Sequence, residues 1–182
     1  MNFVQPIRDT KKINEIIEYL KNQSERNYMI FYLGINTGLR IKDILHLKVK
    51  NLNGHYISGL REFKTGKQKR LRITPSLYRE LEKYCAGMKP NEYLFQSRNG
   101  KNRPIVRETA YKILREAAEA CGVKEIGCHT LRKTYGYHFY LQTKDIALLQ
   151  KLLNHTDQSE TLRYIGVDQD AMDKAMRKFK IV

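Results

Sequence analysis

The sequence has no apolar run that approaches the roughly 20 residues needed to span a bilayer. No secretory signal is visible, because residues 1–6 show no basic stretch followed by an apolar run and a small-residue cleavage site. Acidic residues are few, since 19 Asp and Glu stand against 34 Lys and Arg, which gives a formal net charge of +15. We therefore expect a soluble, cytoplasmic protein with a polyanionic partner. Nucleic acid is favoured over a membrane surface because the basic residues are spread along the chain.

Patterns that bind metals or nucleotide cofactors are also missing. The three cysteines, Cys85, Cys121 and Cys128, are odd in number and not closely paired, so we expect reduced thiols, the first two on apolar helix faces. Cys128 is adjacent to His129, but two ligands without further Cys or His nearby make a poor metal site. The sequence shows no carboxylate cluster of the two-metal nuclease type and no glycine-rich phosphate loop. It therefore implies no metal and no other cofactor.

No repeat, low-complexity tract or linker rich in proline and glycine divides the 182 residues. This length suits one domain with one substantial hydrophobic core. We expect residues 1–182 to form a single, mainly helical α+β domain with a small antiparallel sheet in its N-terminal third.

Apolar residues at helical spacing predict most of the secondary structure. A first helix is predicted around Ile13 to Leu20, and Ser24 is expected to be the N-cap of a second helix that ends at Gly38. Arg40 should then begin a short helical turn. Further helical periodicity runs from Leu77 to Cys85, from Ala110 to Cys121 and from Leu131 to Leu153.

The small sheet is predicted between His55 and Thr74. Residues 56–58 and 71–73 read as strands, and residues 64–69 read as the turn between them. A polar, basic loop is expected over residues 97–104.

Five short stretches carry the most specific signal. They are Thr37-Gly38-Leu39-Arg40, Lys64-Thr65-Gly66-Lys67, His129-Thr130-Leu131-Arg132, Leu153-Asn154-His155, and Tyr164, nine residues past His155. Their order and spacing resemble the catalytic domain of the tyrosine recombinases, also called phage integrases, over about residues 13–179. Asn154 stands where this family more often has glycine, but asparagine tolerates the left-handed backbone conformation that ends a helix.

The resemblance implies a site-specific DNA recombinase that cleaves and rejoins strands through a covalent 3′-phosphotyrosine intermediate, without metal or ATP. Tyr164 would be the nucleophile. Arg40 and Arg132 would hold the two non-bridging phosphate oxygens, because a guanidinium donates parallel hydrogen bonds and stays charged. The covalent bond conserves the energy of the cleaved linkage, so a second strand can attack and religate.

The resemblance also gives roles to the remaining polar residues. Lys64, preferred to Lys67, would protonate the leaving 5′ oxygen. His129 would exchange a proton with the nucleophile near neutral pH. His155 would donate a hydrogen bond to the scissile phosphate. Asp43 would support the residues that contact the phosphate without contacting it itself.

Each candidate also has a plainer interpretation. One arginine among 34 basic residues is more often an ordinary surface residue, and one tyrosine among 12 is more often a core or surface aromatic. The lysines near Lys64 suit a solvated charge cluster, and His155 suits the C-terminus of a helix. Their setting in the motifs favours the catalytic roles, whereas for Asp43 a helix-surface carboxylate is an equal alternative.

Other basic residues would contact the phosphate backbone of the DNA and contribute little to recognition of its base sequence. They are Arg61, Lys67, Lys69, Arg70 and Arg72 around the hairpin, and Arg98, Lys101, Arg103 and Arg107 around the later loop.

The expected partner is double-stranded DNA, with self-assembly on paired sites into a tetrameric synapse. Met172, Ala175, Met176 and Phe179 recur at helical spacing. In relatives such a C-terminal segment docks on a neighbouring subunit, but packing against its own domain is equally compatible here. Full integrases usually carry a separate N-terminal core-binding domain, which we do not expect in this chain. Either an excised catalytic domain or a compact recombinase fits, and a bacterial or phage-derived mobile element is the expected source.

Two rival functions share this fold. A DNA-binding regulator without chemistry is disfavoured because all six catalytic positions hold competent residues. A type IB topoisomerase would relax supercoils and need no partner site, so strand exchange between two duplexes discriminates it from a recombinase. Integration, excision, inversion and resolution are all compatible with the motifs, as is attack by Tyr164 within its own subunit or on a neighbour's DNA.

Overall fold

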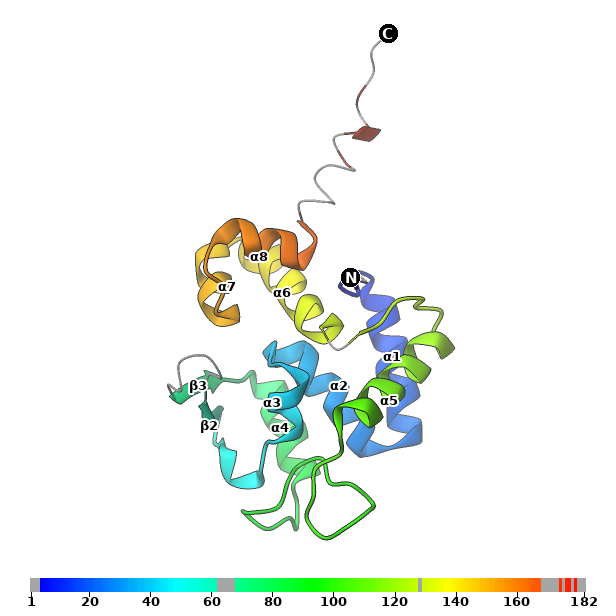
Figure 1. The fold of residues 1–182 in the computed structure, drawn as a ribbon, viewed down its shortest axis with the longest axis vertical. Coiled ribbons are helices and arrows are strands. Elements are labelled where there is room, and N and C mark those ends of the chain that lie inside the picture. Colours follow the sequence, from blue (N-terminus) through cyan, green and yellow to red (C-terminus); the bar gives the residue numbers. More distant parts are fainter. Residues whose placement is uncertain are drawn as a thin grey trace.

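The computed structural model describes residues 4–61, 68–127 and 129–167, and also residues 174, 176, 177 and 179. Its elements, in chain order, are α1 (Thr10–Gln23), α2 (Glu25–Thr37), α3 (Ile41–Leu45), a 3-10 turn (Val49–Asn51), β1 (Leu52–Asn53), β2 (Tyr56–Arg61), β3 (Gln68–Arg72), α4 (Pro75–Tyr84), α5 (Arg107–Ala120), α6 (Thr130–Thr143), α7 (Ile146–Leu153) and α8 (Gln158–Ile165) (Figure 1). None of the helices in these ranges is long and apolar enough to cross a membrane.

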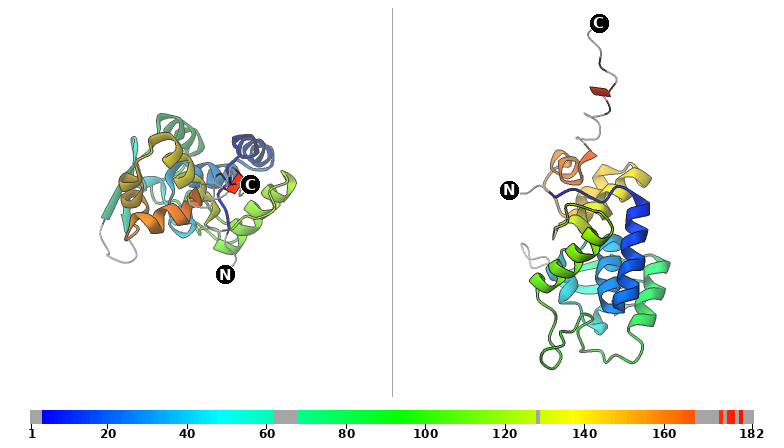
Figure 2. Two further views of the ribbon diagram at one scale, coloured as in Figure 1. Left: turned by 90° about the horizontal axis from the view of Figure 1, so that it is seen from above. Right: turned by 90° about the vertical axis from the view of Figure 1, so that its right-hand side faces the viewer.

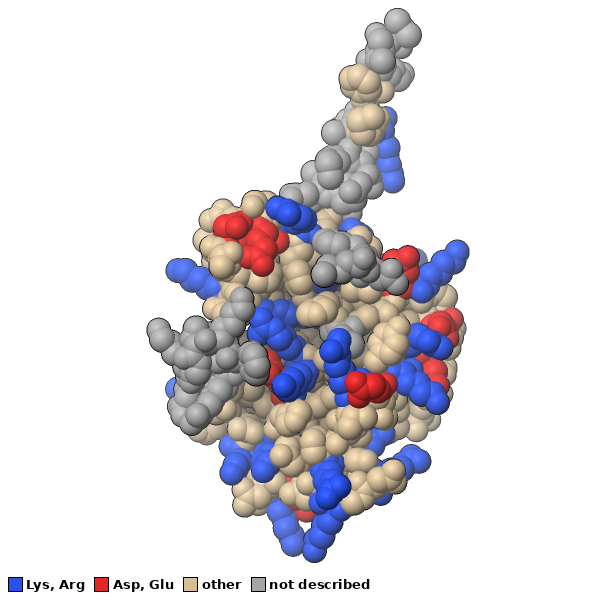
Figure 3. Space-filling view, viewed as in Figure 1, with Lys and Arg blue, Asp and Glu red and all other residues tan. Residues whose placement is uncertain are grey.

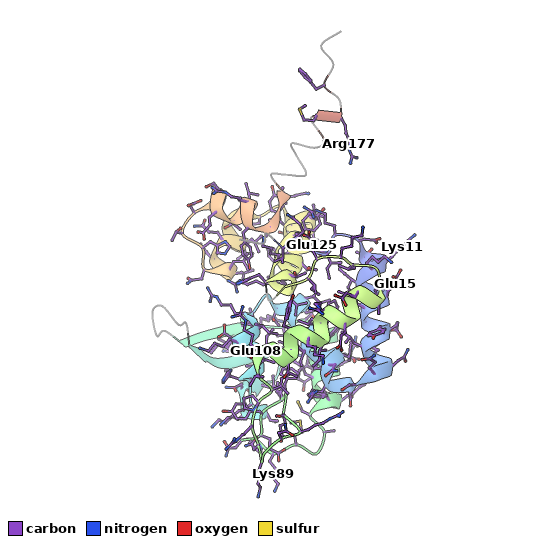
Figure 4. All side chains as sticks on the ribbon, turned by 45° about the vertical axis from the view of Figure 1, so that its right-hand side comes forward. Lys11, Glu15, Lys89, Glu108, Glu125 and Arg177 are labelled. Carbon is purple, nitrogen blue, oxygen red and sulfur yellow. The ribbon has the colours of Figure 1, made fainter. Side chains whose placement is uncertain are left out.

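Helix α2 lies at the centre of the main hydrophobic core. It contacts α1, α3, α4, α5 and α6, and Figure 2 shows these helices packed around it. A helix surrounded in this way must be apolar on most sides, and α2 buries Met29, Ile30, Phe31 and Leu33. The outer helices have a polar side, as on α1, where Lys11 and Glu15 project into solvent (Figure 4). The predicted mainly helical fold is confirmed.

The helix ends near the predicted motifs follow local sequence signals. Ser24 is the N-cap of α2 by position, although its side chain makes no capping hydrogen bond. Gly38 ends α2 in the left-handed conformation with φ +63°, and Arg40 is the N-cap of α3. Because the backbone turns sharply at Gly38, Arg40 lies exposed at the junction between α2 and α3.

The sheet is antiparallel, with strand order β1–β2–β3. The predicted turn was too long, because Gln68 and Lys69 belong to β3, where they pair with Arg61 and Leu60. Once two antiparallel strands are in register, the ladder extends until backbone geometry stops it, whatever the polarity of the side chains. Lys64 and Lys67, within residues 62–67, lie outside the described residues.

The stretch from Leu131 to Leu153, for which helical periodicity was predicted throughout, forms two helices. Lys144 ends α6 in the left-handed conformation with φ +56°. Asp145 is then the N-cap of α7, and its side chain accepts a hydrogen bond from the amide of Leu148 at 2.8 Å. Apolar spacing persisted across this break, so periodicity alone did not show it.

A second, smaller apolar cluster joins α6, α7 and α8. Its fully buried members are Leu149, Leu153 and Ile165, and Tyr164 packs against them. Gly136 of α6 permits this packing, since a Cβ atom there would lie 2.7 Å from Cγ2 of Ile165. The helix that carries Tyr164 is therefore held close to α6.

The two described cysteines agree with the expectation of free thiols. Cys85 and Cys121 are unpaired, half-buried and packed against the main core. Burial raises the pKa of Cys85 to about 11, so its thiol is protonated at neutral pH. Cys128 and most of the predicted C-terminal helix lie outside the described residues.

Replacing Gly38 by alanine is expected to destabilise the fold by about 3 kcal/mol. A left-handed non-glycine residue costs about 1–2 kcal/mol, and overpacking adds about 1–3 kcal/mol. The overpacking arises because a Cβ atom at Gly38 would lie 2.3 Å from Cδ1 of Tyr135. Urea denaturation measures the loss.

Gly54→Ala is the matched control for this substitution. Gly54 also has positive φ, at +54°, but a Cβ atom there would meet nothing within 4 Å. This variant should therefore show the conformational cost of about 1–2 kcal/mol alone. Equal losses for the two variants would show that the contact with Tyr135 is not important.

Candidate active site

Five of the six predicted catalytic residues come together from four separate segments of the chain. Arg40 begins α3, His129 and Arg132 lie at the start of α6, His155 follows α7, and Tyr164 lies in α8. The site lies where the group of α6, α7 and α8 meets the body built around α2 (Figure 1). Lys64, the sixth, is outside the described residues.

Arg132 holds the framework of the site together. Its side chain is only 6% exposed. Nη1 donates a hydrogen bond to the carbonyl oxygen of Gly38 at 2.6 Å, and Nη2 donates to the carbonyl oxygen of Leu153. The first carbonyl lies two residues before Arg40 and the second lies two residues before His155, so one guanidinium links the two segments that carry these catalytic candidates.

Burial lowers the pKa of Arg132, while the nearby Tyr164 phenol and Asp43 carboxyl act in the opposite direction. An arginine starts from so high a pKa that it stays charged. Asp43 therefore faces the site closely enough for its charge to stabilise Arg132. This placement is compatible with the supporting role that we assigned to Asp43.

Tyr164 and His129 are placed for proton exchange. The Tyr164 hydroxyl lies 3.3 Å from Nδ1 of His129, and the two rings are nearly perpendicular. Burial raises the pKa of Tyr164, and the positive charges of Arg132 and Arg40 partly oppose that rise. The buried phenol therefore depends on these cations to ionise.

The surroundings of His129 keep it neutral. Partial burial lowers its pKa from the ordinary 6.5, and the charges of Arg132, Arg107, Lys133 and Arg40 lower it further. At neutral pH the imidazole is therefore uncharged, and one ring nitrogen can accept a proton. This is the state that a base for Tyr164 needs.

His155 is oriented by a neighbour on α8. Its Nδ1 lies 3.1 Å from the hydroxyl of Thr161, which donates its own proton to the carbonyl of Asp157 at 3.0 Å. Because a hydroxyl has one proton, Thr161 accepts from His155, so Nδ1 of His155 carries hydrogen. Burial is the main cause that lowers the pKa of His155, and Glu160 opposes it. Asn154 before it is left-handed with φ +52° and ends α7, as predicted.

The residues predicted to contact DNA lie partly on the sheet and partly on the loop before α5. Arg70 and Arg72 are exposed on β3, and the guanidinium of Arg70 lies 3.5 Å from the ring centroid of Tyr56. For Arg61 and Lys69 the structure describes the backbone, in β2 and β3. The loop that carries Arg98, Lys101 and Arg103 lies at the end of the molecule away from α7 and α8 (Figure 1).

Of the four basic residues predicted around the later loop, Arg107 reaches the site. It begins α5 and lines a cavity of about 380 Å³. The cavity is lined by Arg40, Ile41, Lys42, Leu45, His46, Pro104, Ile105, Val106, Arg107 and His129. In Figure 3, Lys and Arg side chains gather over the middle of this face. Such a surface suits a polyanion.

The described residues hold no group of three or more His, Cys, Asp or Glu placed to bind a metal ion.

Sequence reasoning missed two residues of the site, Thr161 and Lys133. Both lie close to the motifs, Thr161 three residues before Tyr164 and Lys133 directly after Arg132, but neither residue type signals catalysis by itself. Only the packing of α6 against α8 brings them to the site.

Comparisons with known proteins identify the family. The model of the phage integrase family matches residues 8–170. The probable integrase/recombinase YoeC of Bacillus subtilis (strain 168) is 51% identical over 179 residues, covering 98% of both chains.

Two solved structures share the fold at low sequence identity. The crystal structure of XerA recombinase matches with a TM-score of 0.77 and 20% identity over 97% of this chain and 65% of that one. The Tn1549 transposon integrase in complex with circular intermediate DNA matches with a TM-score of 0.69 and 16% identity over 87% of this chain and 60% of that one. With the family match over most of its length, the chain belongs to the phage integrase family.

Proposed function

We propose that this protein is a site-specific tyrosine recombinase that cleaves and rejoins DNA strands through Tyr164. The observation that carries the proposal is the contact of 3.3 Å between the Tyr164 hydroxyl and Nδ1 of a neutral His129, with Arg132 and Arg40 close by. A phenol, a proton acceptor and two fixed cations are what an in-line attack on a phosphodiester requires.

The reaction follows from these positions. The Tyr164 oxygen attacks the scissile phosphorus as its proton passes to His129, and the bond to the 5′ oxygen breaks. Arg40 and Arg132 neutralise the charge that grows on the non-bridging oxygens. His155, whose Nδ1 already donates to Thr161, would donate to the same phosphate from Nε2 in its protonated form, as the motif resemblance implies. Lys64 protonates the leaving oxygen in this proposal, on the strength of the motif resemblance. In the second half, the 5′ hydroxyl of another strand attacks the phosphotyrosine and releases Tyr164.

The partner that we propose is double-stranded DNA. The support is the net charge of +15, the basic face around Arg40 and Arg107, and a related integrase that is described in complex with DNA. We further propose that residues 1–182 act as one catalytic domain and that four copies assemble on paired sites. Pairing is required because strand exchange needs two duplexes held together.

Incubation with nicked duplexes from the flanking genomic DNA, in EDTA, tests the function. A nick next to the cleavage site lets the short product diffuse away, so the covalent intermediate accumulates. We expect a protein–DNA adduct on denaturing gels, and mass spectrometry should find a 3′-phosphate on Tyr164. DNA binding without any adduct on these substrates would instead favour a regulator without chemistry.

A further inference from the structure

We propose that Lys133 is a positioning residue for Tyr164, holding the face of the phenol ring and stabilising its ionised form. The proposal rests on the proposed function, because it concerns the readiness of the same nucleophile. Lys133 is not one of the residues that the motif resemblance identifies.

The geometry places a cation on the ring of the nucleophile. Lys133 follows Arg132 in α6 and is only 5% exposed, which is unusual because lysine is almost never fully buried unless it is paired. Its Nζ lies 5.0 Å from the centroid of the Tyr164 ring. This distance is within the range of cation–π attraction, which is stronger for a cation removed from water.

This contact differs in direction from those of the other cations. His129 meets the Tyr164 hydroxyl, and the ring of His155 lies edge-on at 4.9 Å between centroids. Lys133 instead meets the face of the ring. When the phenol ionises, part of the negative charge spreads into the ring, so a cation on the face stabilises the phenolate more than the phenol. Burial opposes ionisation of Tyr164, and the ring contact works against that penalty.

The N-terminal segment, residues 5–8, packs over this part of the molecule. The amide of Ile7 donates to the hydroxyl of Thr134 at 2.9 Å, and the ring of His138 bonds the carbonyl of Ile7 at 2.9 Å. Arg8 donates from Nη2 to the carbonyl of Gly166, which ends α8, at 3.4 Å. The segment therefore bridges α6 and the end of the nucleophile helix.

This bridge affects Lys133 directly. Burial lowers the pKa of Lys133, and the like charge of Arg8 lowers it further. Lys133 should therefore lose its proton at a lower pH than a surface lysine. Its stabilisation of the Tyr164 phenolate should weaken as the solution becomes alkaline.

Several other charged groups surround Tyr164 and Lys133 and contribute to any pH profile. They are His129 and Arg132 of α6, Arg40 and Asp43 of α3, His155 after α7, Glu160 of α8 and Arg8 of the N-terminal segment. The pKa values of His129 and His155 are lowered from the ordinary 6.5, so the effect of Lys133 is best measured above about pH 7.

The test compares Lys133→Met, Lys133→Gln and Lys133→Arg with wild-type protein on nicked DNA. Single-turnover cleavage rates are measured from about pH 7 to about pH 10, and DNA affinity is measured separately by gel shift. Lys83→Met is the control for loss of one positive charge, since the side chain of Lys83 is 74% exposed on α4. Thermal unfolding shows which variants fold, and the glutamine variant replaces the methionine variant if the latter does not.

We expect the neutral variants to cleave about five- to thirtyfold more slowly, with DNA affinity unchanged. Their rate should rise at higher pH than that of the wild type, because Tyr164 ionises less readily. Lys133→Arg should retain most of the activity. A more acidic nucleophile, 3-fluorotyrosine placed at position 164, should accelerate the neutral variants more than the wild type.

Two results would overturn the proposal. One is a neutral variant with the rate and pH profile of the wild type. The other is a loss that is equal at every pH and is not relieved by 3-fluorotyrosine, as a purely structural role would give. Failure of the proposed function is distinct, because wild-type protein would then form no adduct at all.

Discussion

Replacing Tyr164 by phenylalanine is expected to abolish the covalent adduct and to reduce strand cleavage by at least about 10⁴-fold, the scale seen when a catalytic nucleophile is removed. Phenylalanine keeps the ring, so its packing beside His155 and against the small cluster of α6, α7 and α8 is retained. The expected effect is therefore chemical, with DNA affinity and thermal stability close to those of the wild type. Denaturing gels and gel shifts measure the two properties.

Tyr140→Phe is the matched control. Tyr140 is half-buried and packs in the same small cluster, but its ring faces Lys144 at the end of α6. We expect normal adduct formation from this variant. If the adduct persisted in Tyr164→Phe, another of the 12 tyrosines would be the nucleophile and the proposed mechanism would be wrong.

Replacing Arg132 by methionine should damage both chemistry and stability. Loss of a fixed cation at the scissile phosphate should slow cleavage by about 10²- to 10³-fold, as for other preorganised charge stabilisers. The substitution also leaves the carbonyl oxygens of Gly38 and Leu153 without their donor. Two buried acceptors left unpaired, at about 1–3 kcal/mol each, lower the free energy of unfolding by about 2–6 kcal/mol.

Arg40→Met separates these two effects. Arg40 would hold the same phosphate, but it is exposed at the start of α3. Cleavage should fall by a similar factor, whereas stability should change by less than about 0.5 kcal/mol, as for most surface substitutions. Urea denaturation compares the two variants. If both were equally stable, the hydrogen bonds of Arg132 to the two loops would not contribute to the fold.

Sequence reasoning predicted the fold through signals that act locally. Gly38 and Asn154 end helices as expected, because glycine and asparagine are the residue types that most readily adopt the left-handed conformation at a helix end. Helix α6 starts at Thr130, one residue before Leu131, where helical periodicity was predicted to begin. The convergence of Arg40, His129, Arg132, His155 and Tyr164 was anticipated only through the family resemblance, since nothing local places residues so far apart in the chain together.

Most features that escaped prediction depend on packing between distant segments. The break at Lys144 is local, a left-handed residue followed by the N-cap Asp145, but apolar spacing does not record it. In the sequence nothing distinguishes Lys133 from the other basic residues, because its contact with the Tyr164 ring depends on the packing of α8 against α6. The hydrogen bond between Ile7 and Thr134 joins residues 127 positions apart. Contacts of this kind become visible only in three dimensions.

The two carbonyl oxygens that accept from Arg132 have a consequence for how this site tolerates variation. Main-chain acceptors are present whatever side chain a residue carries, so no substitution at position 38 or 153 deletes them directly. Selection at these positions would act on the path of the backbone instead of on chemical identity. Correlated amino-acid changes between position 132 and its two partners would therefore be absent from an alignment, even though the three residues are coupled in the structure.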